Sequence, residues 1–298
     1  MRFSFWISTQ PTWSEILDLA VHAEATGWDG LWVADHFMPN DDNALDQPMH
    51  ECFSLLAALA PVVPRVRLGS LVAGNTYRHP AVLANQAATI DHIADGRLVL
   101  GIGAGWQQNE HDRYGIPLGT VTERIDWFEE ACQVILALRD QTRADVPGDH
   151  YQLTDAPMEP KPVGPMPLLI GSSGQRRMAA IVAKYADEWN TWSTPALWAE
   201  KRVGYDRALA EIDRDPASLL RSTQAVVFLG DDGLATAEDF AAIRPAIGGT
   251  SQQLIDTIGQ WAEAGLDELI IPSFTLGTGA AAKEAIDQVI TEVAPAFR

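Results

Sequence analysis

The chain has 298 residues, of which 47% are hydrophobic and 20% are charged, a composition typical of a packed globular protein and not of a disordered one. The formal net charge of -19 disfavours nonspecific binding to nucleic acid or to an anionic membrane surface, so we expect a small-molecule substrate as the partner. No apolar run reaches the roughly 18 residues of a membrane span, and the first residues lack the apolar core and cleavage site of a signal peptide, which predicts a cytoplasmic protein.

Short apolar runs alternate with longer segments of helical period along the whole chain. Residues 2–7 predict a strand, and residues 14–26 then place their apolar side chains on one helix face, with Ser14 as the N-cap and Gly27 as the C-cap. The alternation continues and predicts eight strands, at residues 2–7, 30–33, 66–72, 97–102, 168–170, 188–191, 223–229 and 268–271. It predicts eight helices, at residues 14–26, 51–63, 80–94, 121–139, 175–185, 196–213, 252–264 and 281–293.

The order of these elements predicts one α/β barrel domain. Eight strands that are each followed by a helix favour a parallel sheet, and closing it into a (β/α)8 TIM barrel takes about 250 residues. The remaining length fits an insertion after the fourth helix, where residues 144–167 carry six prolines and no helical period. No linker divides residues 1–298, and an open doubly wound sheet is the structural alternative. Cys52 and Cys132 fall in predicted helices without a cysteine neighbour, so we expect no disulfide and no cysteine zinc site.

Two titratable residues follow the second predicted strand. The working residues of such barrels lie just after the strands, and this strand runs directly into Asp35 and His36. A histidine can accept or deliver a proton near neutral pH, so the pair is a candidate for acid–base chemistry. A structural histidine or a helix cap explains the pair equally well.

A glycine-serine turn follows the fifth predicted strand and leads into a helix. Its residues are Gly171, Ser172, Ser173 and Gly174. Backbone N–H groups and the helix dipole at such a turn can hold a phosphate, and Arg176 and Arg177 add positive charge. The alternative is a tight turn capped by serine. The turn is neither a Walker loop nor a GxGxxG motif.

Other features are weaker when taken singly. Gly103, Ala104 and Gly105 follow the fourth strand, where glycine allows close approach of a flat ring but also allows tight barrel packing. Glycines around the end of the third strand indicate a bulge or a close backbone approach. Three tryptophans are candidates for a pocket that holds a flat ring: Trp6, Trp32 and Trp106. A metal site built from His50, Glu110 and His111 is a further alternative, although no HExxH motif is present.

Taken together in chain order, these turns resemble the luciferase-like monooxygenase superfamily and in particular its deazaflavin-dependent branch. The residues that carry the resemblance are 34–37, 77–84, 91–106, 160–162, 169–174 and 186–190. The resemblance implies a (β/α)8 barrel, often dimeric, with Asp35 and His36 beside a reactive ring. It also implies a non-proline cis peptide near Leu71 and Val72 that backs this ring.

The resemblance implies a set of cofactor contacts as well. Ser172, Ser173 and Gly174 would hold the cofactor phosphate. The other expected contacts are Leu71, Val72, Asn75, Gly103, Ala104, Gly105, Gly171 and Arg176. The run Asp35-His36-Phe37 favours the deazaflavin coenzyme F420 over FMN.

The activity implied by the resemblance is hydride transfer between C5 of the deazaflavin and a small organic substrate. His36 would exchange the accompanying proton, and Asp35 would orient His36 or tune its pKa. Sugar-phosphate dehydrogenases of the branch carry Glu where this chain has Trp106, and Trp where it has Asn40. Both departures argue against a sugar phosphate and favour a more apolar pocket. The rival functions are an FMN-dependent monooxygenase, a metal-dependent barrel isomerase or hydrolase, and a cofactor-binding protein without turnover.

Overall fold

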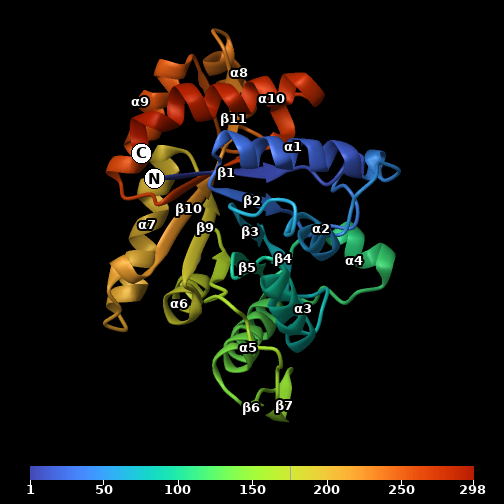
Figure 1. The fold of residues 1–298 in the computed structure, drawn as a ribbon. Helices are drawn as coiled ribbons and strands as arrows, with labels where there is room; N and C mark the ends of the chain where they lie inside the picture. Colours follow the sequence, from blue (N-terminus) through green and yellow to red (C-terminus); the bar gives the residue numbers. More distant parts are fainter. Residues whose placement is uncertain (175) are drawn as a thin grey trace.

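A computed structural model describes residues 1–174 and 176–298 and contains a closed parallel barrel surrounded by helices (Figure 1). The strands run in the order β3-β2-β1-β13-β10-β9-β8-β5, and β3 also pairs with β5, which closes the ring. The predicted (β/α)8 barrel is therefore confirmed, and the open doubly wound sheet is wrong.

Each barrel strand is followed by at least one helix. The barrel strands are β1 (Arg2–Ile7), β2 (Gly30–Val33), β3 (Arg67–Ser70), β5 (Leu98–Gly103), β8 (Leu168–Gly171), β9 (Glu188–Trp192), β10 (Leu220–Gln224) and β13 (Glu268–Pro272). The main outer helices are α1 (Trp13–Thr26), α2 (Cys52–Leu59), α3 (Pro80–Ile93), α5 (Val121–Asp140), α6 (Arg176–Tyr185), α7 (Pro195–Ala210), α9 (Ser251–Glu263) and α10 (Gly279–Gln288). The predicted start of the fifth helix at Gln175 lies outside the described residues.

The N-cap of the first helix lies two residues earlier than expected. Thr12, not Ser14, is its N-cap, because Thr12 and Glu15 form a reciprocal capping box that satisfies two backbone donors. Gly27 ends the helix as predicted, with a φ of 96° that favours glycine.

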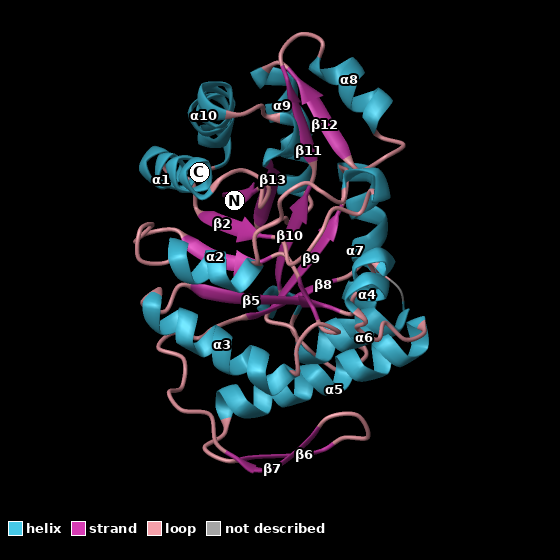
Figure 2. Cartoon of the chain, turned by 90° about the vertical axis from the view of Figure 1, so that its right-hand side faces the viewer, coloured by secondary structure: helices cyan, strands magenta, loops and turns pink. Residues whose placement is uncertain are grey.

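The seventh predicted strand, residues 223–229, is wrong as a single element. The barrel strand β10 ends at Gln224, and β11 (Val226–Leu229) leaves the barrel to pair in parallel with β12 (Ala246–Gly249). Helix α8 (Gly233–Phe240) connects the two, and Figure 2 shows this unit extending from the end of β10. Because residues 223–227 are buried on both sides of the break, the sequence pattern did not indicate it.

The third strand also stops earlier than predicted. β3 ends at Ser70, the peptide bond between Leu71 and Val72 is cis, and β4 (Ala73–Gly74) then pairs with β5. The cis peptide implied by the family resemblance is confirmed. Two further elements complete the chain on this side: α4 (Gln108–Tyr114), which was not predicted, and the hairpin of β6 (Ala144–Pro147) and β7 (Gln152–Ala156) within the predicted insertion.

Two apolar regions hold the barrel together. The larger one fills the space between the strands and the outer helices and includes the unpaired, buried Cys52 and Cys132. A smaller one fills the inside of the barrel and contains Trp6 and Trp32, which are therefore mostly packing residues and not a free pocket wall. Among the described residues, no helix combines the length and the apolar character that crossing a membrane requires.

Candidate functional site

The four strands that precede the predicted site residues are neighbours in the barrel. β2 pairs with β3, β3 with β5, and β5 with β8, all in parallel, so their carboxyl ends share one rim. Asp35 and His36 follow β2, Val72 follows β3, and Gly105 and Ser172 follow β5 and β8. The strand order thus brings the predicted site residues to the same end of the barrel, where such barrels hold their active sites.

His36 is held by a carboxylate that arrives from another part of the chain. Its Nδ1 lies 2.8 Å from Oε1 of Glu110, which belongs to α4 after strand β5. The second oxygen of Glu110 accepts a hydrogen bond of 2.8 Å from the backbone N–H of Phe37. The hydroxyl of Tyr77 also donates to Glu110. Glu110 therefore joins the loops after β2, β4 and β5.

The ionisation of Glu110 determines which nitrogen of His36 carries a proton. Burial raises the pKa of Glu110, but the hydrogen bonds and charge of His36, with the bonds from Tyr77 and Phe37, outweigh it and leave the pKa below its ordinary value. Glu110 is thus a carboxylate that accepts from Nδ1–H. This leaves Nε2 of His36 as the nitrogen that can exchange a proton with a bound molecule.

The side chain of His36 is 24% exposed, in contrast to the fully buried Glu110. The ring of Trp106 stands edge-on to it, with centroids 5.6 Å apart, and Trp106 is itself 53% exposed. The imidazole of His36 and an open aromatic surface therefore lie side by side at the mouth of the barrel.

The expected contact between Asp35 and His36 is corrected by the structure. Asp35 is buried and accepts hydrogen bonds of 2.7 and 3.0 Å from Arg78 and one of 3.1 Å from the N–H of Gly74. Consecutive residues after a strand point to opposite sides, so the partner that orients His36 is Glu110. Burial raises the pKa of Asp35 although the bonds and charge of Arg78 oppose the shift. Asp35 fastens the loop after β2 to β4.

A shallow cradle of backbone lies beside these residues. The side chain of Val72 packs over two glycines, because a Cβ on Gly103 would lie 2.8 Å from its Cγ2 and one on Gly171 would lie 3.0 Å from its Cγ1. Leu71 belongs to the apolar region inside the barrel, and Val72 packs against the same region. Because neither glycine has a side chain, Val72, Gly103 and Gly171 together form a low surface that suits a flat ring.

The remaining predicted contacts surround this cradle. Asn75 is buried, its N–H donates to the carbonyl of Gly103 at 2.9 Å, and its side chain reaches the hydroxyl of Tyr151 at 3.5 Å. Ala104 and Gly105 continue the strand end, and Gly105 has a φ of 86° that favours glycine. These residues fix the position of the loop between β5 and α4.

The glycine-serine turn after β8 is supported by α7, a helix that the sequence did not connect with it. The hydroxyl of Tyr205 donates to Oγ of Ser172 at 2.8 Å. A Cβ on Gly174 would lie 3.7 Å from Cγ of Lys201. Nζ of Lys201 donates to Thr191 Oγ1 at 3.1 Å and to the carbonyl of Trp192 at 2.8 Å, which uses two of its three donors. Burial lowers the pKa of Lys201.

The two arginines after the turn differ from each other. Arg177 donates to Asp126 of α5 at 2.6 Å, so in this structure its charge is paired with a carboxylate. Arg176 and Ser173 are exposed beside the turn. Lys201 lies beside Gly174, and no local motif in the sequence indicates this position.

The three residues of the alternative metal site each contact a different group of the protein. Glu110 binds His36, the Nε2 of His111 lies 2.7 Å from the hydroxyl of Thr76, and the Nε2 of His50 lies 3.0 Å from the carbonyl of Pro11. Within residues 1–174 and 176–298, no three His, Cys, Asp or Glu side chains form a group that could hold a metal ion.

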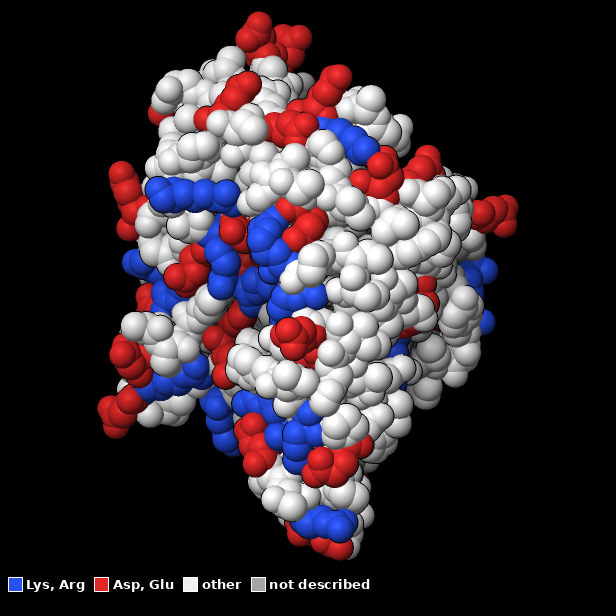
Figure 3. Space-filling view, viewed as in Figure 1, with Lys and Arg blue, Asp and Glu red and all other residues white. Residues whose placement is uncertain are grey.

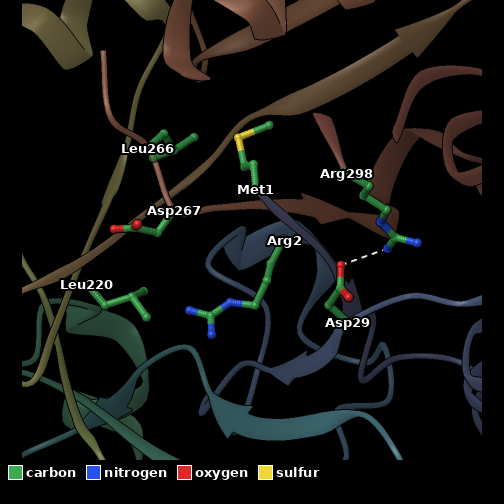
Figure 4. A pocket seen from close by; sticks show the side chains of 7 residues that line it. All are labelled: Met1, Arg2, Asp29, Leu220, Leu266, Asp267 and Arg298. Atoms are coloured by element: carbon green, nitrogen blue, oxygen red, sulfur yellow. Dashed lines mark hydrogen bonds and ion pairs between the residues drawn. The ribbon is translucent and has the colours of Figure 1, made fainter. Parts of the chain in front are cut away.

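A hollow lies at the opposite end of the barrel. It has a volume of about 550 Å³ and is lined by Met1, Arg2, Asp29, Leu220, Leu266, Asp267 and Arg298, all but the last of which stand at the amino ends of strands (Figure 4). Basic and acidic side chains gather on this face in Figure 3, and Arg298 pairs with Asp29 at 2.7 Å. Because its lining comes from strand starts, it is separate from the rim that holds His36.

Comparison with known proteins agrees with this geometry. The chain matches the model of the luciferase-like monooxygenase family over residues 1–294. An F420-dependent glucose-6-phosphate dehydrogenase from Amycolatopsis mediterranei is 33% identical over 173 residues, which cover 58% of this chain and 50% of that protein. A pyrimidine monooxygenase RutA from Methylobacterium radiotolerans is 36% identical over 140 residues, or 46% of this chain and 36% of that protein. The chain spans about half the length of the dehydrogenases it matches.

A solved structure shares the whole fold. The F420-dependent secondary alcohol dehydrogenase in complex with an F420-acetone adduct superposes with a TM-score of 0.85, and the match covers 100% of both chains at 20% identity. At this identity the similarity establishes the fold.

Proposed function

The chain belongs to the luciferase-like monooxygenase family, and we propose that it is an oxidoreductase that transfers a hydride between coenzyme F420 and a small organic substrate. The observation that carries the proposal is the His36–Glu110 contact, which presents a proton-exchanging nitrogen on the same rim as a glycine cradle and a serine turn. When bound, the deazaflavin supplies the hydride chemistry, and the protein supplies placement and proton transfer.

The residues of the rim fit such a cofactor. The flat ring would lie over Val72, which packs closely on Gly103 and Gly171 because neither has a side chain. The anionic tail would meet the N–H groups and hydroxyls of Ser172, Ser173 and Gly174 at the start of α6. Lys201 would add the local positive charge that an acidic chain needs there. Leu71, Asn75, Ala104, Gly105 and Arg176 complete the proposed contacts.

His36 would move the proton that accompanies the hydride. With Nδ1–H held by the Glu110 carboxylate, Nε2 accepts a proton from an alcohol that is oxidised, or returns one to a carbonyl that is reduced. The negative charge of Glu110 stabilises the imidazolium that forms in the first direction. Glu110 acts here as a positioning residue, because it contacts His36 and not the substrate.

F420 is favoured over FMN because the glucose-6-phosphate dehydrogenases that match the chain and the superposed alcohol dehydrogenase are all named as F420-dependent. An FMN-dependent monooxygenase is the second candidate, since a pyrimidine monooxygenase also matches part of the chain.

Trp106 places an exposed aromatic ring at the mouth, so the proposed substrate is less polar than a sugar phosphate. A single domain, a homodimer and a cytoplasmic location are further proposals from the family resemblance, and the mass of the purified protein in solution tests the dimer.

Side-by-side titrations with F420 and FMN, followed by tryptophan fluorescence, test the proposal. We expect F420 to bind more tightly, and we expect Lys201→Gln to weaken its binding by about tenfold, the loss of one charge-assisted hydrogen bond. Arg207→Gln, which removes an exposed charge from the same helix, is the matched control and should leave binding unchanged. Tighter binding of FMN, together with oxygen consumption by the reduced FMN complex, would favour the monooxygenase instead.

A further inference from the structure

One arginine at the barrel mouth has no anionic partner. Arg244 lies in the segment between α8 and β12, is partly buried, and places its guanidinium carbon 5.0 Å from the ring centroid of Trp192. Trp192 is the last residue of β9 and packs against the apolar region that contains Leu71 and Val72. Arg244 therefore stands on the rim that holds the proposed active site, on the side formed by β9.

The absence of a partner distinguishes Arg244 from the other shielded arginines. Within the described ranges, its guanidinium forms no ion pair and no hydrogen bond, and burial alone lowers its pKa. Four other arginines with shielded side chains each pair with carboxylates: Arg67, Arg78, Arg139 and Arg221. A desolvated cation without a partner is unfavourable, and a chain with 40 acidic residues has many carboxylates that could have met it.

The surface next to Arg244 is aromatic. The ring of Trp192 lies 5.7 Å from that of Trp6, and Phe274, which follows β13, lies edge-on to Trp6 at 5.1 Å. Phe274 is 51% exposed, so part of its ring is open to a bound molecule. A cation beside a wall of aromatic rings matches a molecule with an apolar body and one anionic end.

We propose that the substrate of this site is an organic carboxylate, whose carboxylate group binds Arg244 while its apolar body lies against Trp192 and Phe274. The inference rests on the proposed function, because it takes the mouth of the barrel as the active site. It adds a second cation to this side of the rim, where Lys201 donates to the carbonyl of Trp192 and Arg244 lies over the ring of the same residue. A planar guanidinium can hold a carboxylate through two parallel hydrogen bonds, which fixes the orientation of the substrate toward His36.

Binding of matched acid and amide pairs to the F420-loaded protein tests the proposal. The probes are benzoate, 2-naphthoate and decanoate, each compared with its neutral amide by isothermal titration. We expect the best acid to bind at least about tenfold more tightly than its amide, and Arg244→Gln to abolish this preference while changing amide binding by less than about twofold. Arg207→Gln removes an exposed charge and should keep the preference.

Three results would overturn the assignment. One is that no acid binds better than its amide, another is that Arg244→Gln leaves the preference intact, and the third is that this variant weakens F420 binding instead, which would make Arg244 part of the cofactor site. A failure of F420 to bind is a different result, because it contradicts the proposed function. The acid and amide titrations can then be repeated without cofactor and still decide whether Arg244 selects carboxylates.

Discussion

His36 and Glu110 lie 74 positions apart in the sequence, yet Nδ1 of one and Oε1 of the other are 2.8 Å apart at the mouth of the barrel. The carboxylate fixes the protonated nitrogen of the imidazole and directs the other nitrogen to the open side. Since Glu110 also binds the backbone of Phe37 and the hydroxyl of Tyr77, the loop that carries His36 is held from three directions. In the proposed mechanism, this contact determines which nitrogen of His36 exchanges a proton with the substrate.

Replacing His36 with alanine should lower turnover by about 10²–10⁴-fold, the usual contribution of a positioned acid or base. F420 binding should stay within about twofold, because the cofactor contacts lie on β3, β5 and β8. Steady-state rates with a substrate of the wild-type protein, together with an F420 titration, measure both quantities. His22→Ala is the control, since His22 pairs with Asp287 on the outer helices. Equal turnover in His36→Ala and the wild type would remove His36 from the mechanism.

The lowered pKa of Glu110 predicts how stability depends on pH. Unfolding returns Glu110 to its ordinary pKa of 4.5, so the unfolded chain binds the proton at a higher pH than the folded one. This contribution to stability is complete above about pH 4.5 and is lost as the pH falls through the folded-state pKa. Glu110→Gln should therefore show a shallower loss of unfolding free energy between about pH 5 and pH 3 in urea titrations. Parallel curves for the two proteins would contradict the shift.

The cradle predicts opposite effects for two glycine substitutions. Gly103→Ala places a Cβ 2.8 Å from Val72, so we expect a loss of about 1–3 kcal/mol in stability and weaker cofactor binding. Gly204→Ala, in the interior of α7 where nothing lies within 4 Å of the new Cβ, should stabilise the protein by about 0.5–1 kcal/mol. Urea unfolding and F420 titration of both variants measure the difference. Similar values for the two would mean that the cradle is not tightly packed.

The buried pair of Asp35 and Arg78 should contribute to stability more than surface pairs do. Asp35→Asn leaves a guanidinium in a shielded place, and we expect a loss of about 2–3 kcal/mol because Arg78 keeps its bond to Glu51. Asp287→Asn, which removes the exposed partner of His22, should change stability by less than about 0.5 kcal/mol. Thermal unfolding ranks the two variants, and an equal effect would show that Asp35 is not a structural anchor.

The sequence predicts the barrel because each βα unit is local. Apolar runs and helix faces repeat along the chain, and the resemblance adds the cis peptide between Leu71 and Val72, which no periodicity indicates. The division of residues 223–229 into β10 and β11 escapes prediction because the residues on both sides of the break are buried. The hydrophobic pattern of a sequence indicates which residues are buried. It does not indicate which strand pairs with them, because strand pairing depends on the tertiary structure.

The site is predictable only in part for a similar reason. Strand ends indicate which residues share the rim, and His36 and the turn at Ser172 are found that way. The partners of these residues come from other units, as Glu110 does from α4 and Lys201 from α7. Glu110 draws attention in the sequence only as a metal ligand, and Lys201 lies in an ordinary helix pattern. Contacts between units depend on how the barrel closes.

The position of bound F420 relative to His36 tests the central claim most directly. A crystal structure of the complex should place the deazaflavin ring over Val72, its phosphate at Ser172 and Ser173, and the C5 edge on the side of Nε2 of His36. A ring bound at the opposite end of the barrel, in the hollow beside Arg2 and Arg298, or a C5 edge turned away from His36 would contradict it.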